Sequence, residues 1–126
     1  MPAISPAIDA AIDAYLMALH QTAAESANRA GDQAVERGED ASISHAVYSA
    51  TFERGERPRK YLRIVQTTYG GSRHVHSFVD LATGDVLKAA GWTGPAKGAR
   101  YNLLDADSFA EMAQRMDPHG SYLYAR

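Results

Sequence analysis

A helical stripe of apolar side chains runs through the first third of the chain and fades into alanine, and this pattern limits the possible folds most. Ser5 followed by Pro6 is typical of a helix start, because proline loses nothing at a position whose amide is unpaired. The residues that recur at helical spacing are Ile8, Ile12, Tyr15, Leu16 and Leu19, followed by Ala23, Ala27, Ala30 and Ala34. The spacing predicts one long N-terminal helix.

The alanine half of this stripe buries little area per residue, so the helix is poorly stabilised alone. Small side chains allow close approach of a neighbouring element. We therefore expect the helix to pack against a second copy of the chain, as a dimer or higher homo-oligomer. The alternative is a helix that lies on the sheet of its own chain.

Residues 38–58 are ambiguous. Ser42 or Ser44 is a candidate cap for a second helix through Phe52, ended by Gly55 and Pro58. This reading makes the region 1–57 a helical hairpin.

From Tyr61 the period changes to that of strands. β-Branched and aromatic residues in 60–68, followed by the turn 69–73, predict a strand, and residues 74–90 predict a hairpin around "ATGD". A loop at 91–99 precedes a short strand, Tyr101 to Leu104. Asp105 or Asp107 then caps a last helix, and the tail "SYLY" is expected to add an edge strand. We predict a single α+β domain over 1–126, with a helical region (1–57) and a β-rich region (58–126) whose sheet is mainly antiparallel.

The net charge excludes some partners. A formal charge of −2 over 126 residues gives no broad basic field for long nucleic acid, so any anion site must be local. The absence of cysteine excludes disulfides and thiolate metal sites. Asp9 and Asp13 interrupt the first apolar run, which also lacks a basic start, so we expect neither a signal peptide nor a membrane span. These features predict a cytoplasmic protein.

The segment 88–102 gathers groups that suit a small nucleotide. Three glycines allow close approach of backbone amides to an anion, although their spacing is not that of a P-loop. Trp92 offers a plane for stacking, and Asn102 offers an amide. The cations of this segment are Lys88, Lys97 and Arg100. The alternative is a structural loop with Trp92 in the core.

Strict alternation along residues 74–81 predicts that His74, His76 and Phe78 share one face of a strand. Two imidazoles on one face are compatible with a metal, but no third ligand stands at a diagnostic spacing, so we expect no metal and no other cofactor. The chain has no G-x-S-x-G elbow and no recognisable carboxylate pair, so we expect no catalytic residue.

The run "RHVHSFVDLATGDVLKAAGWTGPAKGAR-N" resembles small phage-encoded proteins, the first type of Thoeris anti-defence protein. The matching positions are Val75, His76, Phe78, Thr83, Gly84, Asp85, Lys88, Trp92, Pro95, Ala96, Ala99, Arg100 and Asn102. The likeness covers about 61–105. Tyr101 departs from it, since the family usually has glycine there, as do Thr93 and Gly94 in the loop.

The resemblance implies an oligomeric sponge that binds a cyclic ADP-ribose isomer, and in some members cyclic oligonucleotides, without cleaving it. It implies that Arg100 and Arg29 contact the pyrophosphate, and that Phe78 and Trp92 stack on the adenine. A site shared between two subunits would bring Arg29 to Arg100. Asn102 would hydrogen-bond the base, with His76, Lys88 and Lys97 as further ligand-binding residues. Such a protein acts in the cytoplasm of an infected bacterium.

Two other functions stay open. One is an enzyme that degrades the same signal with His76 or His74 as general acid or base. The other is a small phage regulatory protein that binds DNA or another protein, which the acidic N-terminal helix disfavours.

Overall fold

The structure, a computed structural model, describes residues 4–124, so both ends of the expected 1–126 domain lie outside it. Its elements are α1 (Pro6–Glu36), α2 (Ala41–Tyr48), β1 (Ala50–Arg54), β2 (Tyr61–Thr68), β3 (Arg73–Asp80), β4 (Asp85–Lys88), β5 (Tyr101–Asn102) and α3 (Ala106–Arg115). Two 3-10 turns, Tyr69–Gly71 and Ser121–Leu123, complete them. The predicted α+β class, with a long first helix and a short last one, is confirmed.

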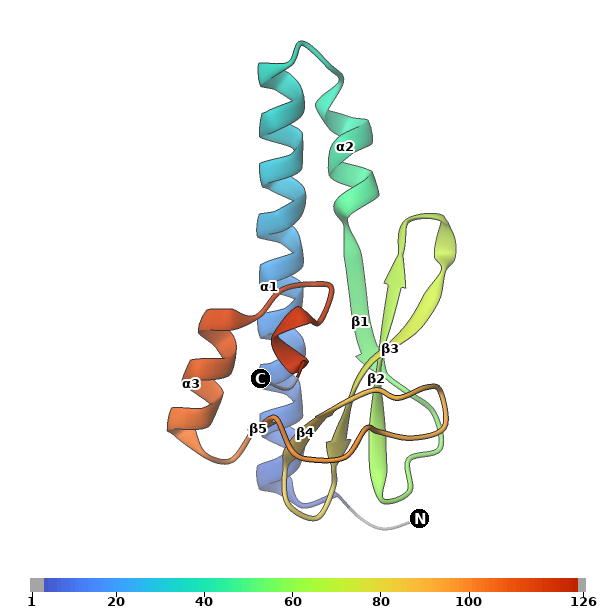
Figure 1. Ribbon diagram of the computed structural model, residues 1–126, viewed down its shortest axis with the longest axis vertical. Coiled ribbons are helices and arrows are strands. Elements are labelled where there is room, and N and C mark those ends of the chain that lie inside the picture. The colour runs from blue at the N-terminus through green and yellow to red at the C-terminus, as the bar shows by residue number, and fades with distance from the viewer. Residues whose placement is uncertain (1–3, 125–126) are drawn as a thin grey trace.

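The five strands form one antiparallel sheet in the order β1-β2-β3-β4-β5. The lower half of α1 packs on one face of this sheet, while its upper half extends beyond the sheet beside α2 (Figure 1). Isoleucines and leucines of α1 meet Leu62, Ile64 and Val79 of the sheet in the main core. We call this the helix face, and the opposite side the outer face.

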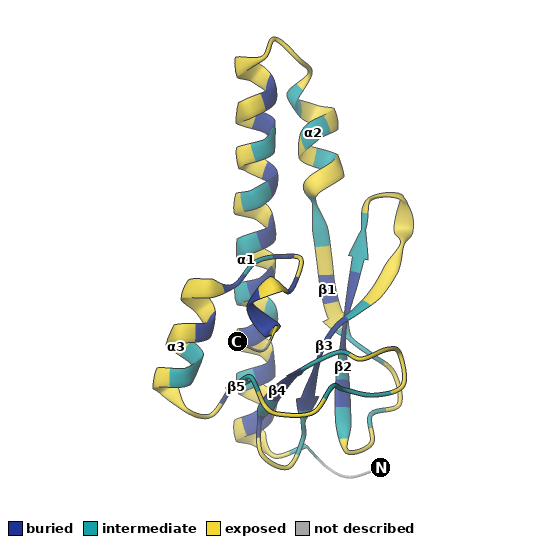
Figure 2. Ribbon diagram, in the orientation of Figure 1, coloured by how far each residue is buried: buried dark blue, intermediate teal, exposed yellow. Residues whose placement is uncertain are grey.

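Helix α1 begins as the sequence predicts. The Ser5 hydroxyl accepts a hydrogen bond from the backbone N–H of Ile8 at 3.2 Å, and Pro6 occupies the first turn. The predicted stripe is buried at intervals along the whole helix, as Figure 2 shows, although Leu16 and Ala30 are only partly buried and Gly31 is buried beside Ala30.

The partner of the alanine stripe differs from the one expected. The stripe is already buried within one chain, and a Cβ added at Gly31 would lie 3.6 Å from the carbonyl oxygen of Ala41 in α2. Small residues therefore allow α2 to lie against α1. The stripe no longer gives a reason to expect a second copy.

The expected second helix is shorter and starts earlier. Asp40, rather than Ser42 or Ser44, caps α2 by accepting from the Ser42 backbone N–H at 2.9 Å. The chain then turns into β1, where a helix through Phe52 was expected, so the helical region ends at Tyr48. Pairing with β2 and a hydrogen bond from the Phe52 N–H to Nε2 of His20, at 3.0 Å, hold this strand.

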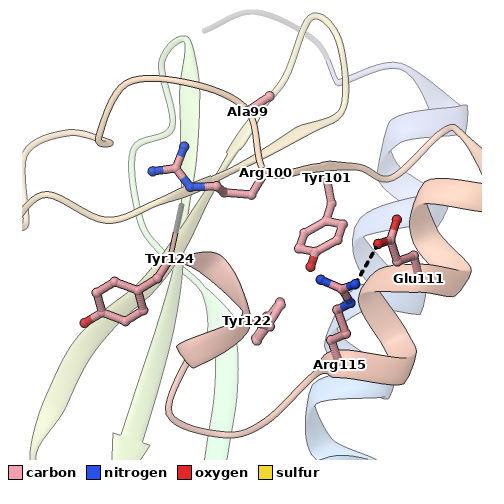
Figure 3. A pocket seen from close by; sticks show the side chains of 7 residues that line it. All are labelled: Ala99, Arg100, Tyr101, Glu111, Arg115, Tyr122 and Tyr124. Carbon is pink, nitrogen blue, oxygen red and sulfur yellow. Dashed lines mark ion pairs between the residues drawn. The ribbon is translucent and has the colours of Figure 1, made fainter. Parts of the chain in front are cut away.

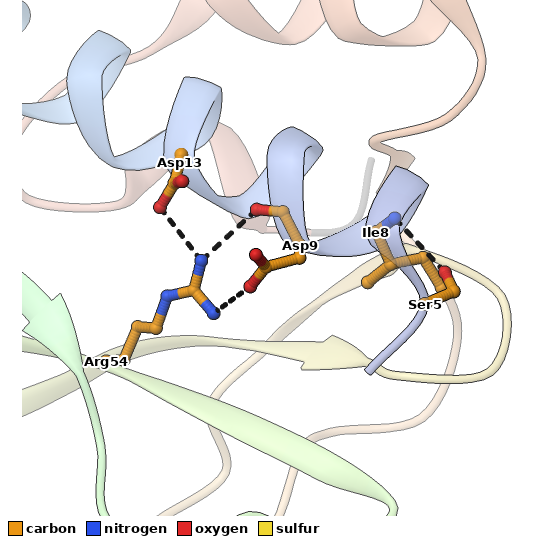
Figure 4. A network of polar contacts seen from close by, with 5 residues as sticks. All are labelled: Ser5, Ile8, Asp9, Asp13 and Arg54. Atoms are coloured by element: carbon orange, nitrogen blue, oxygen red, sulfur yellow. Dashed lines mark hydrogen bonds and ion pairs between the residues drawn. The ribbon is translucent and has the colours of Figure 1, made fainter. Parts of the chain in front are cut away.

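An ion network joins β1 to α1 beyond the ladder. The Arg54 guanidinium bonds the carboxylates of Asp9 at 2.7 Å and Asp13 at 2.8 Å, as well as the Asp9 carbonyl (Figure 4). Each half-exposed pair contributes about 0.2–1 kcal/mol. The two aspartates that interrupt the first apolar run therefore serve as anchors for the edge strand.

A β-bulge changes which residues of β3 share a face. Ile64 pairs with Ser77 and Val65 with Val75, which leaves His76 as an extra residue. His76 and Ser77 consequently both face the helix side, and Phe78 faces the outer side. The prediction that His76 and Phe78 share one face is wrong for this reason.

The C-terminal segment returns to the core instead of extending the sheet. Asp105 caps α3 as predicted, with bonds from the N–H groups of Asp107 and Ser108. The tail forms the 3-10 turn Ser121–Leu123, whose Tyr122 and Leu123 are buried, so the expected edge strand is wrong. Among residues 4–124, no helix is both long and apolar enough to cross a membrane.

Candidate functional site

The loop after β4 presents Trp92 at the surface. Its indole is 49% exposed, so the alternative of a tryptophan in the core is wrong. Backbone bonds from Ala96 to Lys88 at 2.7 Å and from Ala90 to Gly94 at 3.1 Å close the loop. The Arg73 guanidinium lies 6.0 Å from the centre of the indole ring, on the side of β3.

Arg100, expected to grip a phosphate, is engaged by the backbone. Its Nε donates to the Leu123 carbonyl at 2.7 Å, and its Nη1 donates to the carbonyls of Lys97 at 2.9 Å and Gly98 at 2.7 Å. These bonds fasten the loop to the C-terminal turn. Most of the guanidinium is therefore committed to structure.

A pocket of about 300 Å³ lies beside Arg100, between the end of the loop and α3 (Figure 3). We call it the tyrosine pocket; its lining is Ala99, Arg100, Tyr101, Glu111, Arg115, Tyr122 and Tyr124. Its second cation, Arg115, pairs with Glu111 at 3.3 Å. Tyr101, which replaces the glycine usual in the resembling family, forms part of its wall. With one cation paired and the other bonded to carbonyls, this pocket offers little net attraction for an anion.

The side-chain amide of Asn102 is saturated. Nδ2 donates to the Thr83 carbonyl at 3.0 Å and to the Asp85 carboxylate at 2.9 Å, while Oδ1 accepts from the N–H groups of Leu104 and Asp105. An amide has two donors and two acceptor positions. Asn102 fixes the turn between β3 and β4 against β5 and has no group left for a ligand.

The remaining expected ligand residues do not meet around one cavity. Arg29 lines a separate hollow between α1 and the end of α3, and His76 is buried on the helix face. The Lys88 ammonium lies 4.7 Å from the ring centre of Tyr124, and Lys97 is exposed in the loop. Phe78 alone of the expected set lines the pocket described next.

The outer face of the sheet carries a cavity of about 520 Å³. We call it the cation pocket; its lining is Glu56, Arg57, Arg59, Lys60, Tyr61, Arg63, Phe78 and Thr93. Four cations against one carboxylate make it the most positive of the cavities, and its size lies within the roughly 300–1,000 Å³ typical of ligand sites. Thr93 brings the tip of the Trp92 loop to its rim.

The four cations of this pocket lack acidic partners. Within the described part of the chain, the ion pairs are made by Arg37, Arg54, Arg73 and Arg115, and none by a cation of the pocket. Their charges are therefore not cancelled at short range. A pocket of this kind attracts phosphate or carboxylate groups.

Arg63 forms the floor of the cation pocket together with Phe78. The guanidinium carbon lies 5.9 Å from the Phe78 ring centre, and Nε donates to the Trp92 carbonyl. The Tyr61 ring packs edge-on against Phe78, with centroids 6.3 Å apart, and the Lys60 ammonium lies 5.3 Å from the Tyr61 ring centre. Phe78 is only 2% exposed, so Tyr61 is the ring that lies among these cations at the surface.

Arg57 has a backbone conformation that non-glycine residues rarely adopt. Its φ is 54°, the only positive φ of a non-glycine residue in the described part of the chain. The left-handed conformation costs about 1 kcal/mol. A side chain retained at such a position suggests a use for that side chain.

Sequence reasoning missed most of this pocket, although a signal was present. Residues 57–63 read "RPRKYLR", four cations around one aromatic residue. Only the antiparallel register, which pairs Arg63 with Phe78, brings the two segments together.

A third cavity, of about 480 Å³, lies where the α2–β1 junction meets β3 and the C-terminal turn. We call it the imidazole pocket; its lining is Ser26, Val47, Tyr48, Ser49, Ala50, Gln66, Thr68, His74, Val75, His76, Pro118 and His119. Despite its three histidines, residues 4–124 contain no group of His, Cys, Asp or Glu side chains placed to hold a metal ion.

His76 ends a buried chain of hydrogen bonds. Tyr122 and Tyr15 hydroxyls lie 2.8 Å apart, Tyr15 and Ser77 hydroxyls 2.9 Å, and Ser77 Oγ is 3.1 Å from His76 Nδ1. Burial lowers the His76 pKa to about 4, against an opposing effect of Asp117, and raises the Tyr15 pKa to about 12. Because its pKa is lowered to about 4, His76 is neutral near pH 7, which disfavours it as a general acid or base at that pH.

The fold and site define a small α+β protein with a cation-lined pocket on the outer face of its sheet. Residues 3–125 match the model of a family of unknown function, DUF7717, and the chain belongs to that family. No curated protein and no solved structure matches the chain. The resemblance to the Thoeris anti-defence proteins stays a prediction.

Proposed function

We propose that this protein binds a small nucleotide in the cation pocket and sequesters it without cleaving it. The observation that carries the proposal is the set of four cations, which have no acidic partner among residues 4–124, around the ring of Tyr61, which packs against the buried Phe78. Cations attract phosphates, and rings stack on a base. Trp92, exposed beside the rim at Thr93, adds a second flat surface.

The ligand that the family resemblance implies is a cyclic nucleotide immune signal, a cyclic ADP-ribose isomer such as glyco-cyclic ADP-ribose. In this proposal the protein acts in the cytoplasm of an infected bacterium and blocks Thoeris-type immunity. Its mechanism is mass action: protein in excess of ligand, with tight affinity, keeps the free signal below the effector's threshold.

The residue roles in this proposal differ from those that the resemblance implies. Arg57, Arg59, Lys60 and Arg63 meet the phosphates. Tyr61, which is partly exposed, walls the base, and the buried Phe78 supports Tyr61. Arg100 holds the Trp92 loop in shape and Asn102 fixes the turn between β3 and β4, which is supported by their bonds to backbone groups. The matching motif would then preserve the loop's architecture more than its ligand contacts.

Homo-oligomer formation belongs to the same proposal. We call the upper half of α1 together with α2 the helical arm. The support for association is the set of exposed apolar side chains on this arm, which are Val35 on α1 and Ile43, Val47 and Tyr48 on α2. Exposed apolar patches of this kind often mark protein contacts. Burial of this cluster between copies would leave each cation pocket open.

A retention and release assay tests the function. Protein in excess is mixed with TIR-derived cyclic ADP-ribose and filtered, free ligand is measured by mass spectrometry, and the protein is then heat-denatured. The proposal expects retention, followed by release of ligand of unchanged mass. Ligand released with a different mass would indicate an enzyme, and ligand that stays in the filtrate would overturn the proposal for this signal.

Matched variants locate the binding to the cation pocket. Arg59→Ala combined with Lys60→Ala removes two exposed pocket cations and should weaken retention at least about tenfold. Lys97→Ala removes an equally exposed lysine outside the pocket and should leave retention unchanged. If Lys97→Ala weakened retention and the double variant did not, the binding site would lie at the Trp92 loop instead.

A further inference from the structure

We propose that the imidazole pocket is a second binding site, which takes an uncharged planar ring of the nucleobase class. It lies on the helix side of β3, whereas Arg63 and Phe78 place the cation pocket on the outer side. This proposal does not depend on the proposed function.

The first step is the charge of the lining. Among the described residues, no lysine, arginine, aspartate or glutamate lines the imidazole pocket, and His76 is neutral at pH 7 because burial lowers its pKa. A phosphorylated or carboxylated ligand finds no fixed opposite charge here. An uncharged ligand avoids the cost of burying an unpaired charge.

The second step is the pair of polar groups at its inner end. His76 is 7% exposed, and its Nε2 has no hydrogen-bond partner among residues 4–124, since Nδ1 already contacts Ser77. The Gln66 amide donates from Nε2 to the Pro118 carbonyl at 2.8 Å, which leaves Oε1 as an acceptor. A nucleobase edge presents donors and acceptors side by side, so it can serve Gln66 and either tautomer of His76.

The third step is the shape of the walls. The rings of Tyr48, His74 and His119 and the apolar side chains of Val47 and Val75 line the cavity, which is large enough, at about 480 Å³, for one base. Flat rings around a polar end suit stacking of a heterocycle. Gly120, with φ of 80°, borders His76, and a Cβ there would lie 3.5 Å from Nε2. The turn beside the imidazole thus places no side chain against Nε2 at this position.

Adenine is the probe for this site, because it lacks phosphate and ribose. Binding to the full chain is followed by long-range ¹H–¹⁵N spectra of the histidine rings. The proposal expects saturable binding with a shift of the His76 Nε2 resonance. A titration in which that resonance does not move overturns the proposal, because the ligand would then not contact His76.

Ser26→Phe fills the pocket from α1 without touching Gln66 or His76, and it should weaken adenine binding at least about tenfold. Ser26→Ala is its matched control and should bind normally. Gln66→Leu is the second variant, to be used if Ser26→Phe fails to fold. Leucine is similar in size to glutamine but has no Oε1, so this variant should also weaken adenine binding. Arg59→Ala with Lys60→Ala should bind adenine as the unaltered chain does, which separates this test from that of the cation pocket. Adenine binding that survives both Ser26→Phe and Gln66→Leu would overturn the assignment.

Discussion

At the scale of single residues, Arg57 links backbone strain to the cation pocket. Its side chain lines the pocket while its backbone occupies the left-handed region at φ 54°. Glycine adopts this conformation without strain. The side chain is therefore kept at a cost that only its own contacts can offset.

Arg57→Gly should separate binding from stability. We expect the free energy of unfolding to stay the same or rise by up to about 1 kcal/mol, because the strain is relieved. Affinity for the nucleotide should fall several-fold, because one unpaired cation is lost. Urea denaturation and calorimetric titration measure the two effects. A destabilisation of about 1 kcal/mol or more would show that the Arg57 side chain serves the fold instead.

His76 predicts how stability depends on pH. Its pKa is about 4 in the folded chain and about 6.5 in an unfolded one, so only the unfolded state takes up the proton between these values. Protonation of His76 therefore leaves the free energy of unfolding unchanged above pH 6.5. It lowers that free energy by about 3 kcal/mol in all as the pH drops towards 4. His76→Phe should flatten this part of a urea-denaturation series. An equally steep loss in the variant would assign it to other groups.

At the scale of elements, the two halves of the sequence differed in how far they could be predicted. α1, α3 and the strands β2 to β5 follow from period, caps and turns. β1 did not, because its five residues acquire strand form from pairing with β2 and from the His20 bond to Phe52, both distant in sequence. The bulge at His76 was also invisible, because an extra residue in a strand changes no local pattern.

The candidate site was harder to predict than the fold. The sequence indicated an anion site with flat rings, and Phe78 belongs to the pocket that fits this description. Arg100 and Asn102 look like ligand groups in the sequence, yet backbone carbonyls and amides already occupy them. Hydrogen bonds from a side chain to the backbone, whether near or distant in sequence, leave no trace in residue type or spacing.

Gly31 tests how α1 holds α2. A Cβ at this position would meet α2 at 3.6 to 3.8 Å, an ordinary contact distance. Gly31→Ala should therefore raise the free energy of unfolding by about 0.5–1 kcal/mol, since alanine is the better helix former. Gly31→Leu should lower it, because a larger side chain forces the helices apart. Thermal and urea denaturation measure both, and an alanine variant less stable than the parent would contradict this packing.

At the scale of the whole molecule, the arrangement separates two candidate roles. The sheet with its loop carries the cation pocket, while the helical arm extends away with an exposed apolar cluster (Figure 1). Assembly through the arm would leave every cation pocket accessible, because none of the residues that line it lies on the arm. Ligand capture and self-association then depend on different residues.

Light scattering with variants of the arm tests that separation. If copies associate through α2, Ile43→Glu with Val47→Glu should reduce the particle mass to that of one chain, because a charge buried in an apolar contact is costly. Ligand retention per chain should not change. A single-chain mass for the unaltered protein would end the oligomer proposal.

The measurement that tests the central claim most directly is an amide ¹H–¹⁵N titration of the labelled protein with cyclic ADP-ribose. If the cation pocket holds the nucleotide, the largest shifts fall on residues 56–63, on Phe78 and on Thr93, and they shrink when salt is raised to about 0.5 M. Shifts centred on 97–102, or none at all, would contradict the claim.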